Sequence, residues 1–413
     1  MNQASLPLQA LLLDLISVAR PLGADDLREL DDADWDALLD MARRHRLEPL
    51  LHWRLTHERA ALPLPARVRE LLAARFKFYT LRALGQQREL LLAGRVLEQA
   101  GIPYVALKGA GLATQVYPHP ALRPMRDVDF LVPEEDVLRA YQALQDSGLE
   151  RMPEFPGDPA AALSTEHQLP SLRFPAGGGV LEIHCRLFHR TQGAEHDDDL
   201  SADPLFWQRV RPLQVAGRAV PCESPTDLLL HLIVHAVYNH KFDNGPLLLS
   251  DLALLLAREQ IDWPLFWQLA ARGQHTRGCV LGLKLAEHYW GSSNIVWPDG
   301  GAIGLPLLEQ AALLMLRDSA LRKDVLAAQN LAGRRSVRAR LALLLQRAFP
   351  PRRRLASFYP VAADSPRIYL FYPLNWWRLA TRRLPAYIAS LRDTQIQSEA
   401  HQVGELNDWL YAD

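Results

Sequence analysis

The chain has few cysteines and few lysines. Its three cysteines, Cys185, Cys222 and Cys279, are too few and too scattered for a disulfide framework or a cysteine-based zinc site. We expect them to be small buried side chains in a reducing cytoplasm. Only five of the 46 basic residues are lysines, so arginine carries nearly all of the positive charge. A lysine is therefore more noticeable here than in most proteins.

Long apolar segments are also missing. No uncharged apolar run reaches the roughly 18 residues that a membrane-spanning helix needs. The N-terminal stretch contains Asp14 and has neither a basic n-region nor a small-residue cleavage site, so we do not expect a signal peptide. The balance of 46 basic and 47 acidic residues, with 49% hydrophobic residues, excludes a wholly disordered chain and a bulk basic nucleic-acid binder. These features predict a cytoplasmic globular protein.

Hydrophobic patterning divides the 413 residues into four segments. Residues 1–98 have helical spacing and include a long pattern from Ala66 to Gln99, so they are predicted to form an N-terminal helical region. Residues 99–222 alternate short apolar strands with helices, as in the core of an α/β or α+β protein. Residues 223–348 are predicted to form a C-terminal helical domain, and residues 349–413 a tail rich in arginine and aromatic residues. We expect the α+β class, with a small mixed β-sheet flanked by the two helical regions.

The strongest chemical pattern is the sequence Arg-Asp-Val-Asp-Phe-Leu-Val over residues 126–132. Residues two apart in a strand project from the same face, so Asp127 and Asp129 are predicted to present two carboxylates side by side. Carboxylates this close repel each other unless a cation neutralises them, and their oxygens suit Mg²⁺. An Asp-x-Asp also occurs at ordinary solvated strand ends. The pattern alone leaves both interpretations open.

The sequence before this pattern favours a phosphate site. A short apolar run, Ile102–Leu107, is predicted to be a buried strand, and it leads directly into Lys108 and Gly109. Glycine lets a phosphate approach the backbone N–H groups closely, and lysine adds a positive charge. Arg123 and Arg126 are candidates to bind triphosphate oxygens. The alternative for these two arginines is that they balance neighbouring acids.

A third carboxylate follows downstream. The alternating run Val180–His184 is predicted to be a strand with Glu182 and His184 on one face. Three carboxylates on adjacent strands, Asp127, Asp129 and Glu182, beside a glycine turn form the arrangement that metal-dependent phosphoryl or nucleotidyl transfer requires. Glu182 is therefore a candidate metal ligand together with the two aspartates.

Two further candidates lie in the predicted C-terminal helical domain. His231 and His235 are four residues apart on a helix, a spacing that a metal site can use, but the glutamate of a metalloprotease motif is missing. We favour a structural or substrate-side role for them. Asp251 is either the N-cap of a helix or a general base for the acceptor hydroxyl.

The segment from Leu107 to Val132, with its glycine turn and two aspartates, resembles the "uncharacterised nucleotidyltransferase" family of the DNA polymerase β-like superfamily. The later strand around Glu182 and the helical segment 227–256 are similar to that family as well, and the resemblance covers roughly residues 40–290. It implies a small mixed sheet with flanking helices, binding of NTP and Mg²⁺, and transfer of a nucleotidyl group. In this resemblance Asp127 and Asp129 match the metal carboxylates, Glu182 matches the third carboxylate, and Gly109 matches the first glycine of the phosphate-holding turn.

The resulting prediction is a Mg²⁺-dependent nucleotidyltransferase. It moves a nucleotidyl group from an NTP, with ATP favoured, to an unidentified small molecule, peptide or RNA end. The turn Lys108-Gly109-Ala110 departs from the Gly-Ser or Gly-Gly that is usual in the superfamily, and Glu182 replaces the commoner aspartate. A catalytically degenerate protein that keeps the fold as a binding or scaffold module is therefore the alternative. A phosphotransferase that uses the same carboxylates is a third reading.

The charge of the chain is unevenly distributed. Residues 334–392 contain thirteen arginines and a single acid, Asp364, which gives this segment a charge of +12. Because the whole chain carries −1, the remainder carries −13. The arginines are interleaved with tyrosine, phenylalanine and tryptophan, which indicates contact with an anionic membrane surface or RNA. A tail packed over the acidic body is the alternative, and peripheral membrane contact would modify the expected cytoplasmic location.

Overall fold

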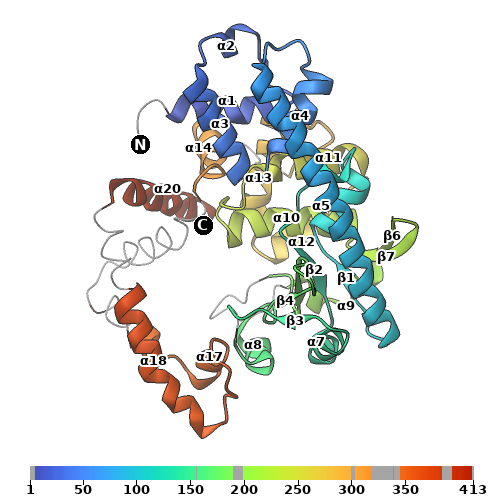
Figure 1. Ribbon diagram of the computed structural model, residues 1–413, viewed down its shortest axis with the longest axis vertical. Helices are drawn as coiled ribbons and strands as arrows, with labels where there is room; N and C mark the ends of the chain where they lie inside the picture. The colour runs from blue at the N-terminus through green and yellow to red at the C-terminus, as the bar shows by residue number, and fades with distance from the viewer. Residues whose placement is uncertain are drawn as a thin grey trace. The chain divides into compact units, whose positions relative to one another are not determined.

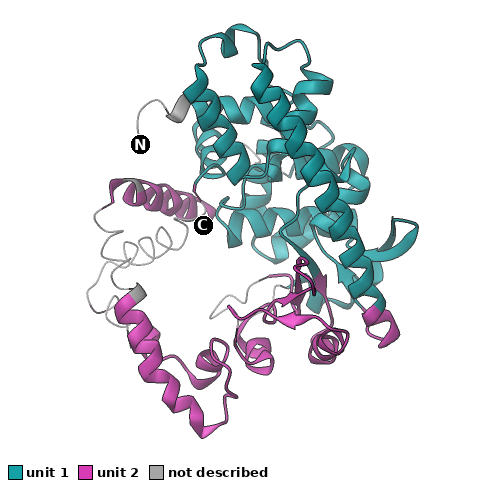
Figure 2. Ribbon diagram, in the orientation of Figure 1, with its two compact units in different colours: residues 1–95, 104–129, 198–317 teal, residues 96–103, 130–197, 318–413 magenta. Residues whose placement is uncertain are grey.

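The structure is a computed structural model, and it describes residues 5–154, 156–188, 199–298, 303–318, 338, 345–383 and 393–411. The chain divides into two compact units (Figure 2). The first unit comprises residues 1–95, 104–129 and 198–317, and the second comprises residues 96–103, 130–197 and 318–413. The four segments expected from the sequence stay a prediction.

Helices form most of the first unit (Figure 1). Those that precede the sheet in sequence are α1 (Ser5–Ile16), α2 (Asp25–Arg28), α3 (Asp32–Arg44), α4 (Glu48–Trp53), η1 (Arg54–Glu58) and α5 (Ala66–Gln99). The long helix α5 has the bounds that the apolar pattern predicts, and it continues into the second unit. At α3 the side chain of Asp31 accepts a hydrogen bond of 2.9 Å from the N–H of Asp34. This bond satisfies a donor at the helix start and accounts for part of the acidic stretch there.

The remaining helices of the first unit lie within or after the predicted core. They are α6 (Gly109–Gly111), η2 (Leu112–Val116), η3 (Pro120–Leu122), η4 (Leu200–Ala202), α9 (Pro204–Arg209), α10 (Pro225–Val234), η5 (His235–Asn239), α11 (Leu247–Arg258), α12 (Trp263–Arg272), α13 (Thr276–Trp290) and α14 (Leu305–Leu314). The helix α10 begins where Ser224 accepts a hydrogen bond from the N–H of Asp227. Every residue of α10 after Pro225 is buried, as expected of a helix packed on all sides.

A seven-stranded mixed sheet contains the predicted core strands, in the order β3-β4-β5-β2-β1-β7-β6. The strands are β1 (Val105–Ala106), β2 (Asp127–Leu131), β3 (Glu150–Arg151), β4 (Leu172–Arg173), β5 (Val180–His184), β6 (Arg211–Val215) and β7 (Arg218–Cys222). The pair β1–β7 is parallel, whereas β3–β4, β4–β5 and β6–β7 are antiparallel. A mostly helical protein with this mixed sheet confirms the predicted α+β class.

Two features of the sheet differ from the sequence expectation. The strand predicted over Ile102–Leu107 contains only the two-residue β1. Patterning also missed the hairpin β6–β7, which turns at residues 216–217, both at positive φ. The hairpin matters for the site because β7 pairs with β1, with Cys222 opposite Ala106.

The second unit contains the other end of the sheet and the arginine-rich segment. Its helices are α7 (Val137–Asp146), α8 (Pro159–Thr165), α17 (Arg352–Ala356), η6 (Pro366–Leu370), α18 (Phe371–Arg378), η7 (Leu379–Arg383) and α20 (Thr394–Leu410). Of the arginine-rich segment 334–392, residues 334–337, 339–344 and 384–392 lie outside the described residues. Within the described ranges, no helix is both long enough and apolar enough to cross a membrane.

Candidate functional site

The turn after β1 is held in an unusual conformation. Lys108 has φ 46° and ψ −110°, and a positive φ is uncommon for a residue with a side chain. Its backbone N–H donates a hydrogen bond of 3.0 Å to Oε2 of Glu223. Gly109 begins α6 and is buried, and a Cβ there would lie 2.8 Å from Cγ of Met125. The turn therefore has no room for a side chain at Gly109 unless Met125 moves.

The strand β2 brings Asp127 and Asp129 together beside this turn. Asp129 is only 9% exposed, and Asp127 is half-buried. Burial, followed by the negative charge of Asp129, raises the pKa of Asp127 to about 6, although Lys108 and Arg126 act in the opposite direction. Nζ of Lys108 lies 3.7 Å from Oδ2 of Asp129. The pair is thus a concentrated negative charge of the kind that a cation stabilises.

Glu182 and His184 lie on β5, the neighbour of β2 in the sheet. Three possible ligand atoms lie within 4.8 Å of one another: a carboxylate oxygen of Asp129, a carboxylate oxygen of Glu182 and a ring nitrogen of His184. Oε1 of Glu182 accepts a hydrogen bond of 3.1 Å from Oγ of Ser171, and its Oε2 lies 3.9 Å from Nε2 of His184. Two carboxylates and an imidazole are a donor set that fits a divalent cation. Asp127, two residues before Asp129 on β2, is not one of these three, so its part in a shared site with Glu182 stays a prediction.

The two arginines predicted to bind triphosphate have different surroundings. Nε of Arg123 donates a hydrogen bond of 2.6 Å to Oδ1 of Asp251, whose side chain is 3% exposed. The hydroxyl of Tyr117 donates to the same oxygen at 2.6 Å. Burial, and then the charge of Asp251, raise the pKa of Tyr117 well above its usual range, so this hydroxyl stays a neutral donor. Arg126, by contrast, is exposed.

These bonds also decide the role of Asp251 in its helix. Asp251 lies inside α11, whose N-cap is Pro246, so the interpretation of Asp251 as an N-cap is wrong. Its carboxylate instead ties α11 to Arg123 and to Tyr117. A role as general base stays a prediction.

Sequence reasoning missed Glu223, which follows β7 directly. Its Oε1 lies 2.7 Å from Nδ1 of His231 on α10, while its Oε2 accepts the N–H of Lys108. The side chains of Glu223 and His231 are each 1% exposed. The sequence did contain a signal for Glu223: it stands directly before Ser224 and Pro225, which are typical of a helix start. Glu223 thus connects the Lys108 turn with α10.

The Glu223 contact gives His231 a structural partner. The rings of His231 and His235 have centroids 6.1 Å apart. In the parts of the chain that the structure describes, the three-residue group suited to a metal contains neither histidine. This arrangement agrees with the structural interpretation of His231.

A small pocket adjoins the turn. Its lining includes the charged residues Lys108, Arg211 and Glu223, and the remaining lining residues are Ala106, Gly111, Gln115, Val116, Leu213, Cys222, Leu228 and Leu255. Burial, followed by the charge of Glu223, raises the pKa of the Cys222 thiol to about 12. The thiol is therefore protonated near neutral pH and unsuited to nucleophilic chemistry. Because the thiol is unsuited to chemistry, the charged residues of the lining are the ones that could bind a polar ligand.

Comparison with known proteins adds one match. A family model described as "Uncharacterised nucleotidyltransferase" matches residues 31–291, which is more than half of the chain. The matched range includes both aspartates of β2, the Lys108 turn, β5 and the helices α10 and α11. No curated protein matches the chain.

Proposed function

The chain belongs to the uncharacterised nucleotidyltransferase family, and from this premise we propose that it is a metal-dependent nucleotidyltransferase. It transfers the nucleotidyl group of an NTP, with ATP favoured, to a small molecule, a peptide or an RNA end. The observation that carries the proposal is the carboxylate pair of half-buried Asp127 and buried Asp129 beside the turn at Lys108 and Gly109. The buried free cysteines support a cytoplasmic location.

The carboxylates supply the binding site for Mg²⁺ in this proposal. Asp129 and Glu182 hold the cation, and Asp127, two residues earlier on the same strand, is a further ligand in this proposal. Ligand atoms of Asp129, Glu182 and His184 lie within 4.8 Å of one another. When bound, Mg²⁺ neutralises phosphate oxygens and activates the incoming oxygen. The raised pKa of Asp127 supports this assignment, because a nearby cation relieves the repulsion between the two carboxylates.

Residues around the turn hold the triphosphate. Lys108 provides a side-chain charge, and Gly109 allows close approach to the backbone. Arg126 is exposed and can reach a phosphate directly. Arg123 forms an ion pair with Asp251, so its guanidinium acts on the triphosphate from a fixed position. It can bind a phosphate oxygen directly only if that oxygen replaces Asp251.

The test follows two differently labelled nucleotides. The intact chain is incubated with Mg²⁺, the three acceptor classes and ATP labelled at either the α- or the γ-phosphate. We expect the α-label, and not the γ-label, in the product. Asp129→Ala should lower the transfer rate by at least about a thousandfold, because several kcal/mol of charge stabilisation are lost. The matched control Asp146→Ala, at an exposed position of α7, should keep full activity.

Other outcomes of this assay would contradict the proposal. Transfer of the γ-label alone identifies a phosphotransferase. No transfer to any acceptor, together with no Mg²⁺-dependent binding of ATP, identifies the second candidate, a non-catalytic binding or scaffold module. One observation favours that candidate: Nζ of Lys108 already lies 3.7 Å from Asp129, where it offers a resident positive charge.

A further inference from the structure

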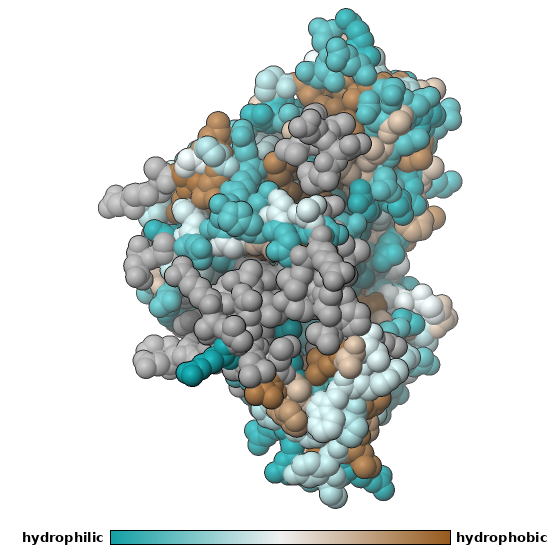
Figure 3. Space-filling model, turned by 90° about the vertical axis from the view of Figure 1, so that its left-hand side faces the viewer, coloured by the Kyte–Doolittle hydropathy of each residue, from teal (hydrophilic) through white to brown (hydrophobic). Residues whose placement is uncertain are grey.

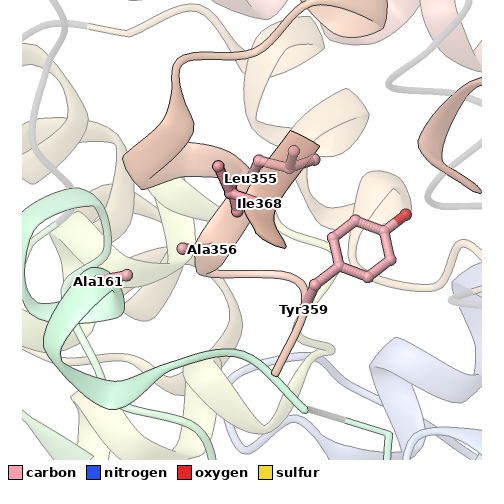
Figure 4. Packing of buried hydrophobic residues seen from close by; sticks show 5 residues of the cluster. All are labelled: Ala161, Leu355, Ala356, Tyr359 and Ile368. Carbon is pink, nitrogen blue, oxygen red and sulfur yellow. The ribbon is translucent and has the colours of Figure 1, made fainter. Parts of the chain in front are cut away.

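The arginine-rich part of the second unit has one side that is firmly packed. We call residues 345–383 the Arg/aromatic segment. Its helix α17 packs on α8, and the buried cluster between them contains Ala161, Leu355, Ala356, Tyr359 and Ile368 (Figure 4). The N–H of Asp158 donates a hydrogen bond of 3.0 Å to the carbonyl of Ala356, and Arg354 pairs with Glu166 at 2.5 Å. A Cβ on Gly157 would collide with the backbone of Ser357.

Internal contacts hold the rest of the segment in place. The hydroxyl of Tyr372 donates to the carbonyl of Pro350 at 2.7 Å, and the indole N–H of Trp376 donates to the carbonyl of Ala348 at 2.8 Å. The rings of Phe349 and Trp376 have centroids 5.3 Å apart. The helix α18 is therefore presented in a defined orientation on the segment.

Other side chains of the segment are exposed and apolar. The large exposed side chains of the segment are Leu370 (74%), Phe349 (57%), Trp377 (56%), Tyr369 (55%), Leu345 (52%), Trp376 (42%), Leu374 (42%) and Phe358 (38%). Figure 3 shows pale and brown residues beside teal ones at the lower end of the view, where α18 lies in Figure 1. These residues come from η6, α18 and the chain on either side of α17. They form an apolar surface that the described residues leave in contact with solvent.

Exposed arginines occur along the same segment, and the guanidinium of Arg352 lies over the ring of Tyr369, 5.7 Å from its centroid. Arg352, Arg353, Arg367 and Arg378 are all exposed, and Asp364 is the single acid between residues 345 and 383. Exposed arginines together with exposed tryptophan and leucine suit the two layers of a membrane surface, with anionic headgroups outside and acyl chains beneath. Tryptophan and tyrosine also prefer the headgroup level of a bilayer.

We propose that the exposed side of the Arg/aromatic segment binds an anionic membrane surface. Single-stranded RNA is the other candidate, because arginine binds its phosphates and aromatic rings stack on its bases. The exposed leucines favour the bilayer, because an aliphatic side chain gains from burial among acyl chains but has no ring to stack on a base. The helix α18 has eight residues, so the contact is peripheral.

The experiment measures co-sedimentation of the full chain with vesicles. Vesicles of phosphatidylcholine mixed with phosphatidylglycerol should bind the chain, and high salt should weaken the binding. Vesicles of phosphatidylcholine alone should bind it much less. Arg352→Glu combined with Arg353→Glu should weaken binding to mixed vesicles by at least about tenfold, since each basic residue near the surface contributes about 1 kcal/mol.

Matched controls separate this surface from general stickiness. Leu370→Ser should weaken vesicle binding severalfold, whereas Leu205→Ser on α9, where the leucine is 55% exposed, should not. Arg69→Glu, at an exposed position of α5, is the charge control. An unchanged thermal midpoint shows that each variant is folded. Absence of vesicle binding at low salt would overturn the proposal. The proposal would also be overturned if the control variants lost as much vesicle binding as the test variants. Binding of a single-stranded RNA oligonucleotide in place of vesicles would overturn it as well.

Discussion

Charged side chains are arranged in opposite ways around the candidate nucleotide site and in the Arg/aromatic segment. In the site, Glu223, Asp251 and Asp129 are buried, and each lies next to a positive or hydrogen-bond-donating partner. In the segment, four of the six arginines whose side chains the structure describes are exposed, as are several aromatic and leucine side chains. A buried charge is costly to leave without its partner, whereas an exposed charge costs little and stays available to a ligand. The overall charge of −1 reveals neither arrangement.

The largest loss of stability is expected from the buried ion pair. Asp251→Ala leaves the guanidinium of Arg123 and the hydroxyl of Tyr117 without their shared acceptor. We expect the free energy of unfolding to fall by about 3–5 kcal/mol, measured by urea denaturation. Asp32→Ala removes an 88% exposed partner of Arg67 and should cost less than about 1 kcal/mol. If Asp251→Ala and Asp32→Ala lowered the free energy of unfolding equally, the distinction between buried and exposed charges would be wrong.

A smaller loss is expected at Glu223. Glu223→Gln keeps the shape of the side chain but removes its charge, so the hydrogen bond from Lys108 N–H is weakened, and His231 keeps its contact only if Nδ1 accepts from the new amide group. The free energy of unfolding should fall by about 1–3 kcal/mol, and ATP should bind less tightly because the turn is loosened. Glu287→Gln, at a half-exposed partner of Lys284, is the control and should change neither quantity appreciably. Unchanged ATP binding in Glu223→Gln would show that the turn does not hold the nucleotide.

The carboxylate pair predicts a dependence on pH. The pKa of Asp127 is raised from 3.8 to about 6 in the folded chain, so the native state binds this proton more tightly than the unfolded state. The contribution of Asp127 to stability is therefore greatest below about pH 4 and is lost as pH rises through 6. Without metal, Asp127→Asn should be more stable than the parent by about 1–2 kcal/mol at pH 8, with no gain near pH 3.5. A gain that does not vary with pH would contradict the raised pKa that burial, and then the charge of Asp129, give to Asp127.

The smallest effect is expected at the edge of the Arg/aromatic segment. Glu166 pairs with Arg354, and their side chains are 29% and 43% exposed. Glu166→Gln should lower the free energy of unfolding by less than about 1 kcal/mol, because solvent screens the pair. Thermal unfolding provides the measurement. A loss of several kcal/mol would show that α17 depends on this ion pair more than on the apolar cluster with α8.

Local patterns predicted the elements whose signals are contained in a short stretch of sequence. The helix α5 has the bounds that apolar periodicity indicates, and alternation identified β5. Asp127 and Asp129 were found because a strand places residues two apart on one face. Each of these inferences needs only the period of one element.

Long-range pairing was not accessible in the same way. The bond between Arg123 and Asp251 joins residues 128 positions apart, so no local pattern records it. The hairpin β6–β7 and Glu223 depend on where β7 pairs with β1, which is a property of the folded sheet. The short β1 is a strand mainly because of this pairing, and apolar composition alone overestimated its length.

The central claim is that Asp127 and Asp129 form the metal and nucleotide site. A crystal structure of the chain with Mg²⁺ and a non-hydrolysable ATP analogue tests it most directly. We expect oxygens of both aspartates about 2.0–2.1 Å from Mg²⁺ and the triphosphate against Lys108 and Gly109. An analogue bound elsewhere, or carboxylates that contact no metal at saturating Mg²⁺, would contradict the claim.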